Sequence, residues 1–539
     1  MNRRRLALGA SIVLVTLLGY FEFPGHTYLQ SDTQVYVPMM ERLRDPSLFT
    51  RDIMVLRTHL TYTAYDETTL ALVRISGMRL ETVLVAEQLV FRALGVTGLL
   101  LIALRLGLDP VAAWFVAAVA SLGATIGGPA VLTVEYEPVP RGFAISLIVL
   151  AIGLVAEERY AAGGIAAATA FLYHPPTAVP FWILAAILVM RRQAAWMLVV
   201  PLAASIAVLA CLAHVQRSGV EAVPLLARLD AFQESLQRMR AGYSYVSSWG
   251  AWRMADYGCQ ALVVVLAWRR LRAPRGGPLA GFLCGLPAAG LLSIPLSWTL
   301  LEWQHFALAP EWQPARAVLF VTLMAAILAA AAGVGAAIEH RRIEAAFWLS
   351  VAFFLPVKHA SLGATFRPAP LALACGLGLL AVAGCWFLRA KQGWMLVPAA
   401  LLAFFAMPIL VQNYSNIETR ELTELAGWAR TATDRDAVFL FPDARTELDP
   451  GVFRARALRA LYVDWKSGGQ VNYFPQFSRQ WWTRWVETGS GRWNVTGRDF
   501  PRLGALGVDY VVVRSAHAIT GESPAFSNSR YVAYRISSR

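Results

Sequence analysis

Residues 6–32 read LALGASIVLVTLLGYFEFPGHTYLQSD, an apolar run that ends at Phe21 and a polar segment that ends at Asp32. The run approaches the ~20 apolar residues that a helix needs to cross a bilayer. No small-residue cleavage site follows it, so we expect a retained first helix and not a signal peptide. This stretch predicts a membrane helix followed by a polar loop, and the rest of the chain repeats that pattern.

The composition is typical of a membrane protein. Hydrophobic residues make up 57% of the 539 residues and charged residues 15%, against about 25% charged residues in soluble domains. The formal charge of +13 comes from basic residues scattered between apolar runs, without a basic arm, which argues against nucleic-acid binding. The five cysteines lie in apolar segments without CxxC pairs, so we expect neither a disulfide framework nor a zinc site.

Apolar runs recur along the first 411 residues. Two of them, 160–173 and 178–190, are separated by His174-Pro-Pro and could form either one kinked helix or two short helices. The runs cover residues 6–21, 83–104, 111–127, 142–156, 160–173, 178–190, 194–214, 252–268, 279–299, 316–337, 343–356, 369–388 and 394–411.

The arginines favour two helices at this break, and so about thirteen transmembrane helices. With the N-terminus in the cytoplasm, the short turns at Arg105, Arg159, Arg191 and 269–275 then all face the cytoplasm, as the positive-inside rule requires. The long connections face outward: residues 22–82, 128–141, 215–251, 300–315 and 357–368. Because 45 of the 48 basic residues are arginine, we expect a GC-rich bacterial source. The apolar runs then predict a multi-pass protein of the bacterial inner membrane.

A second domain follows residue 411. Residues 412–539 are more charged and contain no run long enough to span a bilayer. Alternating helix and strand patterns predict a small α/β domain, and the span count places it outside the cytoplasm. The predicted elements are helices over 418–431 and 477–488 and strands over 437–441, 508–514 and 530–536. Residues 1–411 then form the transmembrane domain, with 22–82 as its first outer loop.

Asp32 is the first candidate for chemistry. Val35, Met39, Met40 and Leu43 follow it at helical spacing, which predicts a short helix lying on the membrane interface. A carboxylate near the N-terminus of that helix stays ionised, as a general base must. The alternative is that Asp32 only caps the helix. Asp52 and Asp66 are weaker candidates in the same loop.

A second group of charges lies in the outward loop VEYEPVPR, which ends at Arg141. Glu135 and Glu137 could bind a metal ion or a sugar hydroxyl, and Arg141 a phosphate. A salt-bridged structural turn is the alternative.

A third group is cationic and lies at the outer helix ends. Arginine and lysine gathered there would suit a phosphate or pyrophosphate, whereas side chains snorkelling at the interface would explain each residue singly. The members are His174, Arg316, Lys358, His359 and Arg367.

With these features in view, the chain resembles the GT-C superfamily of membrane glycosyltransferases, as an uncharacterised bacterial member. The resemblance rests on the span count, the large first outer loop with Asp32, the outward charged loops and the C-terminal domain. It implies an inverting transferase that moves a sugar from a polyprenyl-phosphate-linked donor to a glycan, lipid or protein of the cell envelope, at the outer face of the inner membrane. Asp32 would be the base, while Arg316, Arg367 or Lys358 would hold the donor phosphate.

Two points stay open. The family often pairs two acids in this loop, whereas here Thr33 follows Asp32, so a divalent metal ion is neither implied nor ruled out. A transporter or flippase of a lipid-linked glycan is an alternative, with Asp256 as its charge within a span. A non-catalytic membrane assembly protein is another. No nucleotide-binding motif supports ATP-driven transport.

Overall fold

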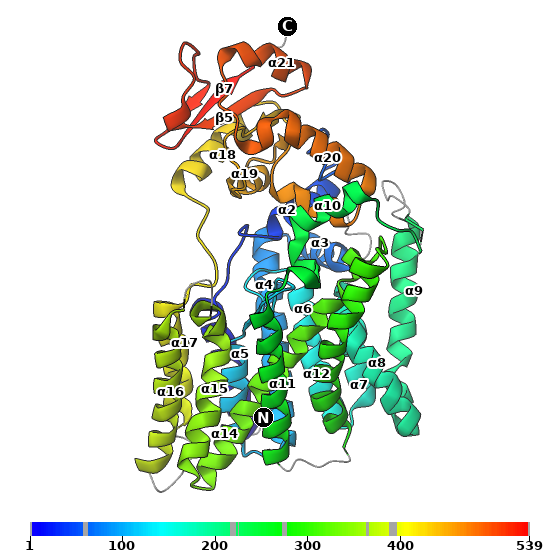
Figure 1. Cartoon of the computed structure of the whole chain (residues 1–539), viewed down its shortest axis with the longest axis vertical. Coiled ribbons are helices and arrows are strands. Elements are labelled where there is room, and N and C mark those ends of the chain that lie inside the picture. The colour runs from blue at the N-terminus through cyan, green and yellow to red at the C-terminus, as the bar shows by residue number, and fades with distance from the viewer. Residues whose placement is uncertain are drawn as a thin grey trace.

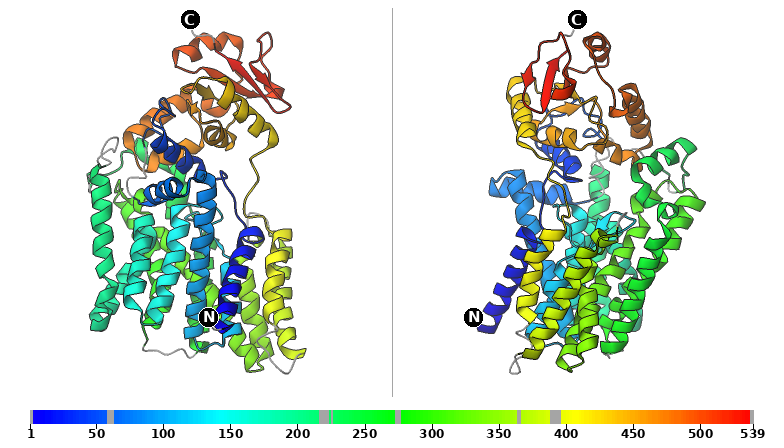
Figure 2. Two further views of the ribbon diagram at one scale, coloured as in Figure 1. Left: turned by 180° about the vertical axis from the view of Figure 1, so that it is seen from behind. Right: turned by 60° about the vertical axis from the view of Figure 1, so that its left-hand side comes forward.

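The helices of the chain stand side by side in a bundle, and a small C-terminal domain lies over one end of it (Figure 1). This computed structural model describes residues 3–57, 63–215, 223–224, 226–271, 277–362, 366–387 and 396–536. We call the bundle end beneath the small domain the capped end and the opposite end the free end. The chain starts at the free-end half of the bundle (Figure 2).

Each of the predicted apolar runs contains a helix, although the run 111–127 is helical only to Ser121 and its residues 125–126 form a strand. Among the described residues, five helical segments are long and apolar enough to cross a membrane by length and composition, and seven shorter apolar helices accompany them. The chain is therefore a mainly helical membrane protein. The bundle helices are α1 (Arg3–Phe21), α4 (Leu80–Arg105), α5 (Pro110–Ser121), α6 (Pro140–Ala156), α7 (Tyr160–Tyr173), α8 (Pro175–Arg191), α9 (Val200–Val215), α11 (Ala251–Leu271), α12 (Pro278–Ser297), α14 (Leu319–Ile338), α15 (Arg342–Ser361), α16 (Pro368–Phe387) and α17 (Leu396–Leu410).

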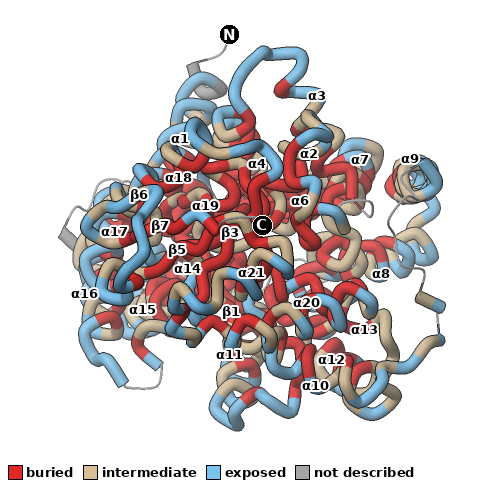
Figure 3. Tube along the Cα trace, turned by 90° about the horizontal axis from the view of Figure 1, so that it is seen from above, coloured by how far each residue is buried: buried red, intermediate tan, exposed pale blue. Residues whose placement is uncertain are grey.

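Small residues let the centre of the bundle pack tightly. α14 is buried along nearly its whole length and is rich in alanine. Small side chains allow helix backbones to approach closely in a membrane protein. Seen from above, buried segments fill the middle of the molecule and exposed ones form its rim (Figure 3).

The break at His174 separates two antiparallel helices, as predicted. α7 ends at Tyr173 and α8 begins at Pro175. Arg192, just after α8, pairs with Glu158, just before α7, at 3.5 Å. The two helices therefore form a hairpin with His174 at its tip.

The C-terminal domain is a mixed five-stranded sheet with helices. Its strand order is β4-β3-β5-β7-β6, in which β3 is parallel to β4 and β5, and β7 is antiparallel to β5 and β6. All five predicted elements are present, whereas the helices α19 and α21 and the two-residue strands β4 and β6 were not predicted. The strands are β3 (Val438–Leu440), β4 (Ala460–Leu461), β5 (Tyr510–Arg514), β6 (Phe526–Ser527) and β7 (Tyr531–Arg535), and the main helices are α18 (Arg420–Ala432), α19 (Asp449–Ala457), α20 (Pro475–Glu487) and α21 (Phe500–Ala505).

The first long loop is packed between the bundle and this domain (Figure 2). It contains α2 (Thr33–Arg44) and α3 (Tyr65–Ser76). A short helix after Asp32 was predicted with four apolar residues facing the membrane surface, but three of the four pack inside the protein. These three, Val35, Met39 and Met40, are buried within the protein, and α2 packs against α19. Gly451 makes this contact possible, because a Cβ there would collide with Gln34.

Candidate active site

A cavity of about 410 Å³ lies at the capped end, where segments far apart in the sequence meet. The first loop, the β1–β2 hairpin (Thr125–Ile126 and Val131–Leu132), and the starts of α6 and α8 form part of its wall. Helix α10 (Ala231–Ala241) and the 3₁₀ helices η6 (Pro314–Val318) and η8 (Lys466–Asn472) complete it. The cavity contains six of the nine predicted site residues: Asp32, Glu135, Glu137, Arg141, His174 and Arg316.

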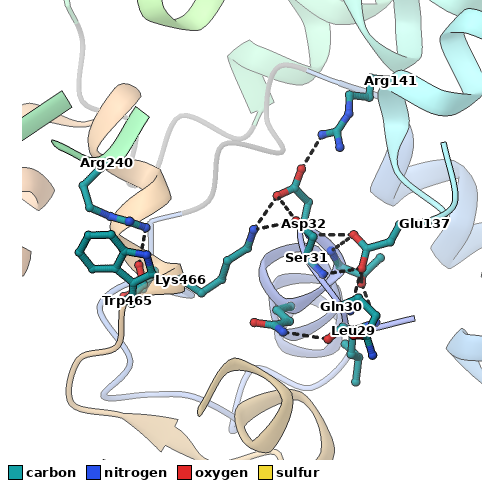
Figure 4. A network of polar contacts seen from close by, with 12 residues as sticks. Leu29, Gln30, Ser31, Asp32, Glu137, Arg141, Arg240, Trp465 and Lys466 are labelled. Carbon is teal, nitrogen blue, oxygen red and sulfur yellow. Dashed lines mark hydrogen bonds and ion pairs between the residues drawn. The ribbon is translucent and has the colours of Figure 1, made fainter. Parts of the chain in front are cut away.

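Asp32 sits between two cations (Figure 4). Its carboxylate accepts hydrogen bonds from Lys466 Nζ at 2.7 Å and from Arg141 Nη1 at 2.5 Å. Its side chain makes no capping hydrogen bond to α2, although Asp32 occupies the N-cap position. The carboxylate thus faces the cavity, and the capping alternative does not describe it.

Glu137 caps α2 in place of Asp32. Its carboxylate accepts hydrogen bonds from the backbone N–H groups of Gln30, Ser31 and Asp32 at 2.8, 2.6 and 2.7 Å, and from the Thr33 hydroxyl at 2.9 Å. It also accepts from the Thr33 N–H at 3.3 Å, the first N–H of α2, which has no partner inside the helix. Glu137 therefore positions Asp32 by fixing the backbone around it.

Arg141 joins two carboxylates. While Nη1 binds Asp32, its Nε donates to Glu135 Oε1 at 2.7 Å. Gly142 allows Glu135 to approach the start of α6, because a Cβ there would lie 2.8 Å from the Glu135 Cβ. Arg92 of α4 supports the same corner by donating to the backbone carbonyls of Gly25 and Glu135 at 2.6 and 2.8 Å.

The charges around Asp32 keep it ionised. Burial alone would raise the pKa of its carboxyl group, but the charges of Lys466 and Arg141 outweigh burial and hold that pKa well below the ordinary value of 3.8. In this resting arrangement Asp32 is a weak base.

The opposite side of the cavity is cationic. The Arg316 Nε is buried and has no hydrogen-bond partner among the described residues, and the same holds for the Arg240 Nε. The Arg240 guanidinium lies 3.5 Å from the centre of the Trp465 ring and donates to the Trp465 carbonyl. Both arginines line the cavity and add positive charge to it.

Sequence reasoning missed Arg240 and Lys466. Lys466 lies 434 positions from Asp32 in the chain, so no local pattern could connect the two. One signal was available, because Lys466 is one of only three lysines in the sequence.

The other three predicted residues lie outside the cavity. Lys358 of α15 is buried and pairs with Asp256 of α11 at 2.5 Å. His359 and Arg367 are exposed and do not line the cavity. Lys358 is therefore paired with Asp256 and does not line the cavity.

Asp52 and Asp66 also lie away from the cavity. Asp52 accepts from Arg454 Nε at 2.9 Å in a buried ion pair. Asp66 of α3 is 2% exposed, and burial together with the charge of Glu67 raises its pKa to about 8. The folded chain thus retains a proton that the unfolded chain loses near pH 3.8, so Asp66 makes stability fall as pH rises from about 4 to about 8.

Asp66→Asn should remove this penalty. We expect the variant to melt at least about 2 °C above the parent protein at pH 8.5, with the difference shrinking towards pH 5. Thermal unfolding of the purified protein in detergent across this range measures it, with the exposed Asp436→Asn as control. A difference that does not vary with pH would contradict the assignment.

An apolar cavity of about 330 Å³ adjoins the polar one. The two share the side chains of Tyr36, His174 and Tyr473. Most of the remaining lining is apolar, with Glu311 as its one acid: Thr63, Pro140, Phe171, Pro175, Pro176, Val179, Leu209, Ala213, Glu311 and Trp312. A polar and an apolar compartment thus meet at three side chains.

Within the described part of the chain, no group of three or more His, Cys, Asp or Glu side chains is placed to hold a metal ion. In the cavity, the carboxylates of Asp32 and Glu137 are both bound by donors of the protein itself.

A family model described as Domain of unknown function (DUF6798) matches residues 420–488, from α18 to the end of α20. No curated protein matches the chain. Among solved structures, the chain is similar to a crystal structure of ArnT from Cupriavidus metallidurans in the apo state, with a TM-score of 0.47 and 13% identity over 99% of this chain and 98% of that chain.

Proposed function

We propose that this protein is a membrane glycosyltransferase that moves a sugar from a polyprenyl-phosphate-linked donor to a cell-envelope acceptor, which is a glycan, a lipid or a protein. The observation that carries the proposal is the position of Asp32. Its ionised carboxylate faces a cavity whose other wall is cationic, and an apolar cavity opens beside it.

The cavity pair matches the two parts of such a donor. Arg316 and Arg240 line the polar cavity, and arginine is well suited to phosphate oxygens. The apolar cavity would hold the first isoprene units of the donor chain. Tyr36, His174 and Tyr473 would lie where the chain joins the phosphate.

The reaction needs one base and one anion site. The acceptor hydroxyl oxygen attacks the anomeric carbon, and Asp32 takes the hydroxyl proton. The bond between the anomeric carbon and the phosphate oxygen breaks, and its electron pair leaves with the polyprenyl phosphate. The arginines stabilise the charge that develops there. Attack from the face opposite the phosphate inverts the anomeric configuration.

The charges at the free end support an orientation in the membrane. Arg105 and Arg270 lie there, where they pair with Glu157 and with Glu339 and Glu344. Under the positive-inside rule this end faces the cytoplasm. The cavity and the C-terminal domain would then lie outside the cytoplasm, on the outer face of a bacterial inner membrane.

Transport of a lipid-linked glycan is the second candidate, favoured by the Asp256–Lys358 pair between α11 and α15. One experiment separates the two. The purified protein is reconstituted in vesicles containing a lipid-linked sugar fraction from the source membrane, and release of polyprenyl phosphate is measured with and without added acceptor extract. Acceptor-dependent release is expected. Sugar lipid that crosses the bilayer unchanged would support transport instead, and neither event would favour an assembly protein.

A further inference from the structure

The segment at residues 464–468 of the C-terminal domain is held firmly against the bundle. Asp464 accepts from Arg454 Nη2, and its other carboxylate oxygen accepts from the Ser467 backbone N–H at 3.3 Å. Arg454 also binds Asp52 of the first loop. The side chains of Arg454, Asp52 and Asp464 are each about 1% exposed. A buried charge bridge thus fixes this segment relative to the loop that carries Asp32.

Helix α10 makes a second set of contacts with this segment. Arg240 stacks on Trp465 and donates to its carbonyl. It also lies close to Gly468, where a Cβ would collide with the Arg240 Nε. Between Trp465 and Gly468, the segment projects Lys466 into the cavity, as Figure 4 shows for Arg240, Trp465 and Lys466.

Lys466 and Arg141 hold Asp32 in different ways. Arg141 is shared with Glu135, which is buried beside it. Lys466 donates to Asp32 at 2.7 Å and to the Ser31 hydroxyl at 3.2 Å, and makes no ion pair with any other described residue. If Asp32 releases Lys466, that ammonium has no second carboxylate and is open to an anion in the cavity.

We propose that the C-terminal domain binds the phosphate of the substrate through Lys466, which exchanges Asp32 for that phosphate when the substrate enters. This proposal rests on the proposed function. The exchange removes one of the two cations that neutralise Asp32, so the carboxylate becomes a stronger base only when a phosphate is present. In this exchange, residues 420–488, which match a domain of unknown function, contribute Lys466 directly to the site.

The groups that face Asp32 are consistent with the exchange. Arg141 remains on Asp32 from α6, and Glu137 stays bound to the backbone of residues 30–33. Arg240 and Arg316 line the same cavity and add positive charge there for the phosphate. Only the Lys466 contact has to change.

Binding of farnesyl phosphate to the full chain in nanodiscs tests this, because the probe carries the prenyl phosphate without a sugar. Farnesol and inorganic phosphate separate the contributions of chain and phosphate. We expect Lys466→Met to weaken binding at least about tenfold. Asp32→Asn should strengthen it about tenfold, because it removes the competing carboxylate. The double variant should bind like Lys466→Met, and Lys466→Arg should retain binding.

The outcomes are distinct. If the parent protein binds farnesyl phosphate but neither single variant changes the affinity, Lys466 only pairs with Asp32, and the exchange is overturned while sugar transfer stands. If both variants shift as expected but the parent protein transfers no sugar, the proposed function fails and the phosphate site stands. If no variant binds the probe, there is no phosphate site and the exchange is again overturned. Melting temperatures of all variants show that each is folded.

Discussion

Asp32→Asn is expected to reduce sugar transfer by about 10²- to 10⁴-fold, the usual contribution of a general base. Asparagine has nearly the same shape as aspartate but cannot accept the acceptor's proton. The backbone around residue 32 is held by Glu137 and not by the Asp32 side chain. The variant should therefore fold and insert normally, so the loss should appear in kcat.

The control for this prediction is Asp45→Asn, at the other end of α2. Asp45 binds Ser47 on the surface and does not line the cavity, so its replacement should leave transfer unchanged. Transfer is followed as acceptor-dependent release of polyprenyl phosphate. Full activity in Asp32→Asn would remove Asp32 from the role of base.

Arg454→Met should be the most destabilising substitution at the domain interface, at about 3–5 kcal/mol. It leaves Asp52 and Asp464 as buried charges without their shared partner. The matched control is Arg420→Met, because the Arg420 side chain is 89% exposed in a surface pair with Glu424 and exposed pairs contribute little. Denaturant or thermal unfolding in detergent measures the difference.

A neutral triple variant sharpens this test. In Asp52→Asn/Arg454→Met/Asp464→Asn no charge remains buried without a partner, so much of the lost stability should return. Farnesyl phosphate should bind more weakly to the triple variant than to the parent protein. The reason is that the segment with Lys466 has lost its ion pair with Arg454. Equal stability of Arg454→Met and Arg420→Met would contradict the buried bridge.

The helices and strands could largely be predicted because their signals are local. Apolar runs mark the bundle helices, and His174-Pro-Pro marks the turn between α7 and α8. In the C-terminal domain, the elements with clear periodicity were found, while α19, α21, β4 and β6 were not. The two strands are two residues long, too short for a pattern to emerge.

The site could be predicted only in part. Asp32, Glu137, Arg141 and Arg316 were selected for their charge and their position at helix ends, and the cavity brings them together with Glu135 and His174. Lys358 met the same criteria, but Asp256 on a neighbouring helix pairs with it. Which cations face a cavity and which are neutralised depends on partners that are remote in sequence.

The sequence by itself determined the membrane character of the chain, the positions of its helices and the acidic residue of the first loop. These follow from hydropathy and from residue spacing, which act over a few turns of the chain. Only the tertiary structure decided that α2 packs under the C-terminal domain, that Glu137 caps it and that Lys466 reaches Asp32. Those contacts join residues more than a hundred positions apart. Because ion pairs and hydrogen bonds act through space, no local pattern in the sequence predicts them.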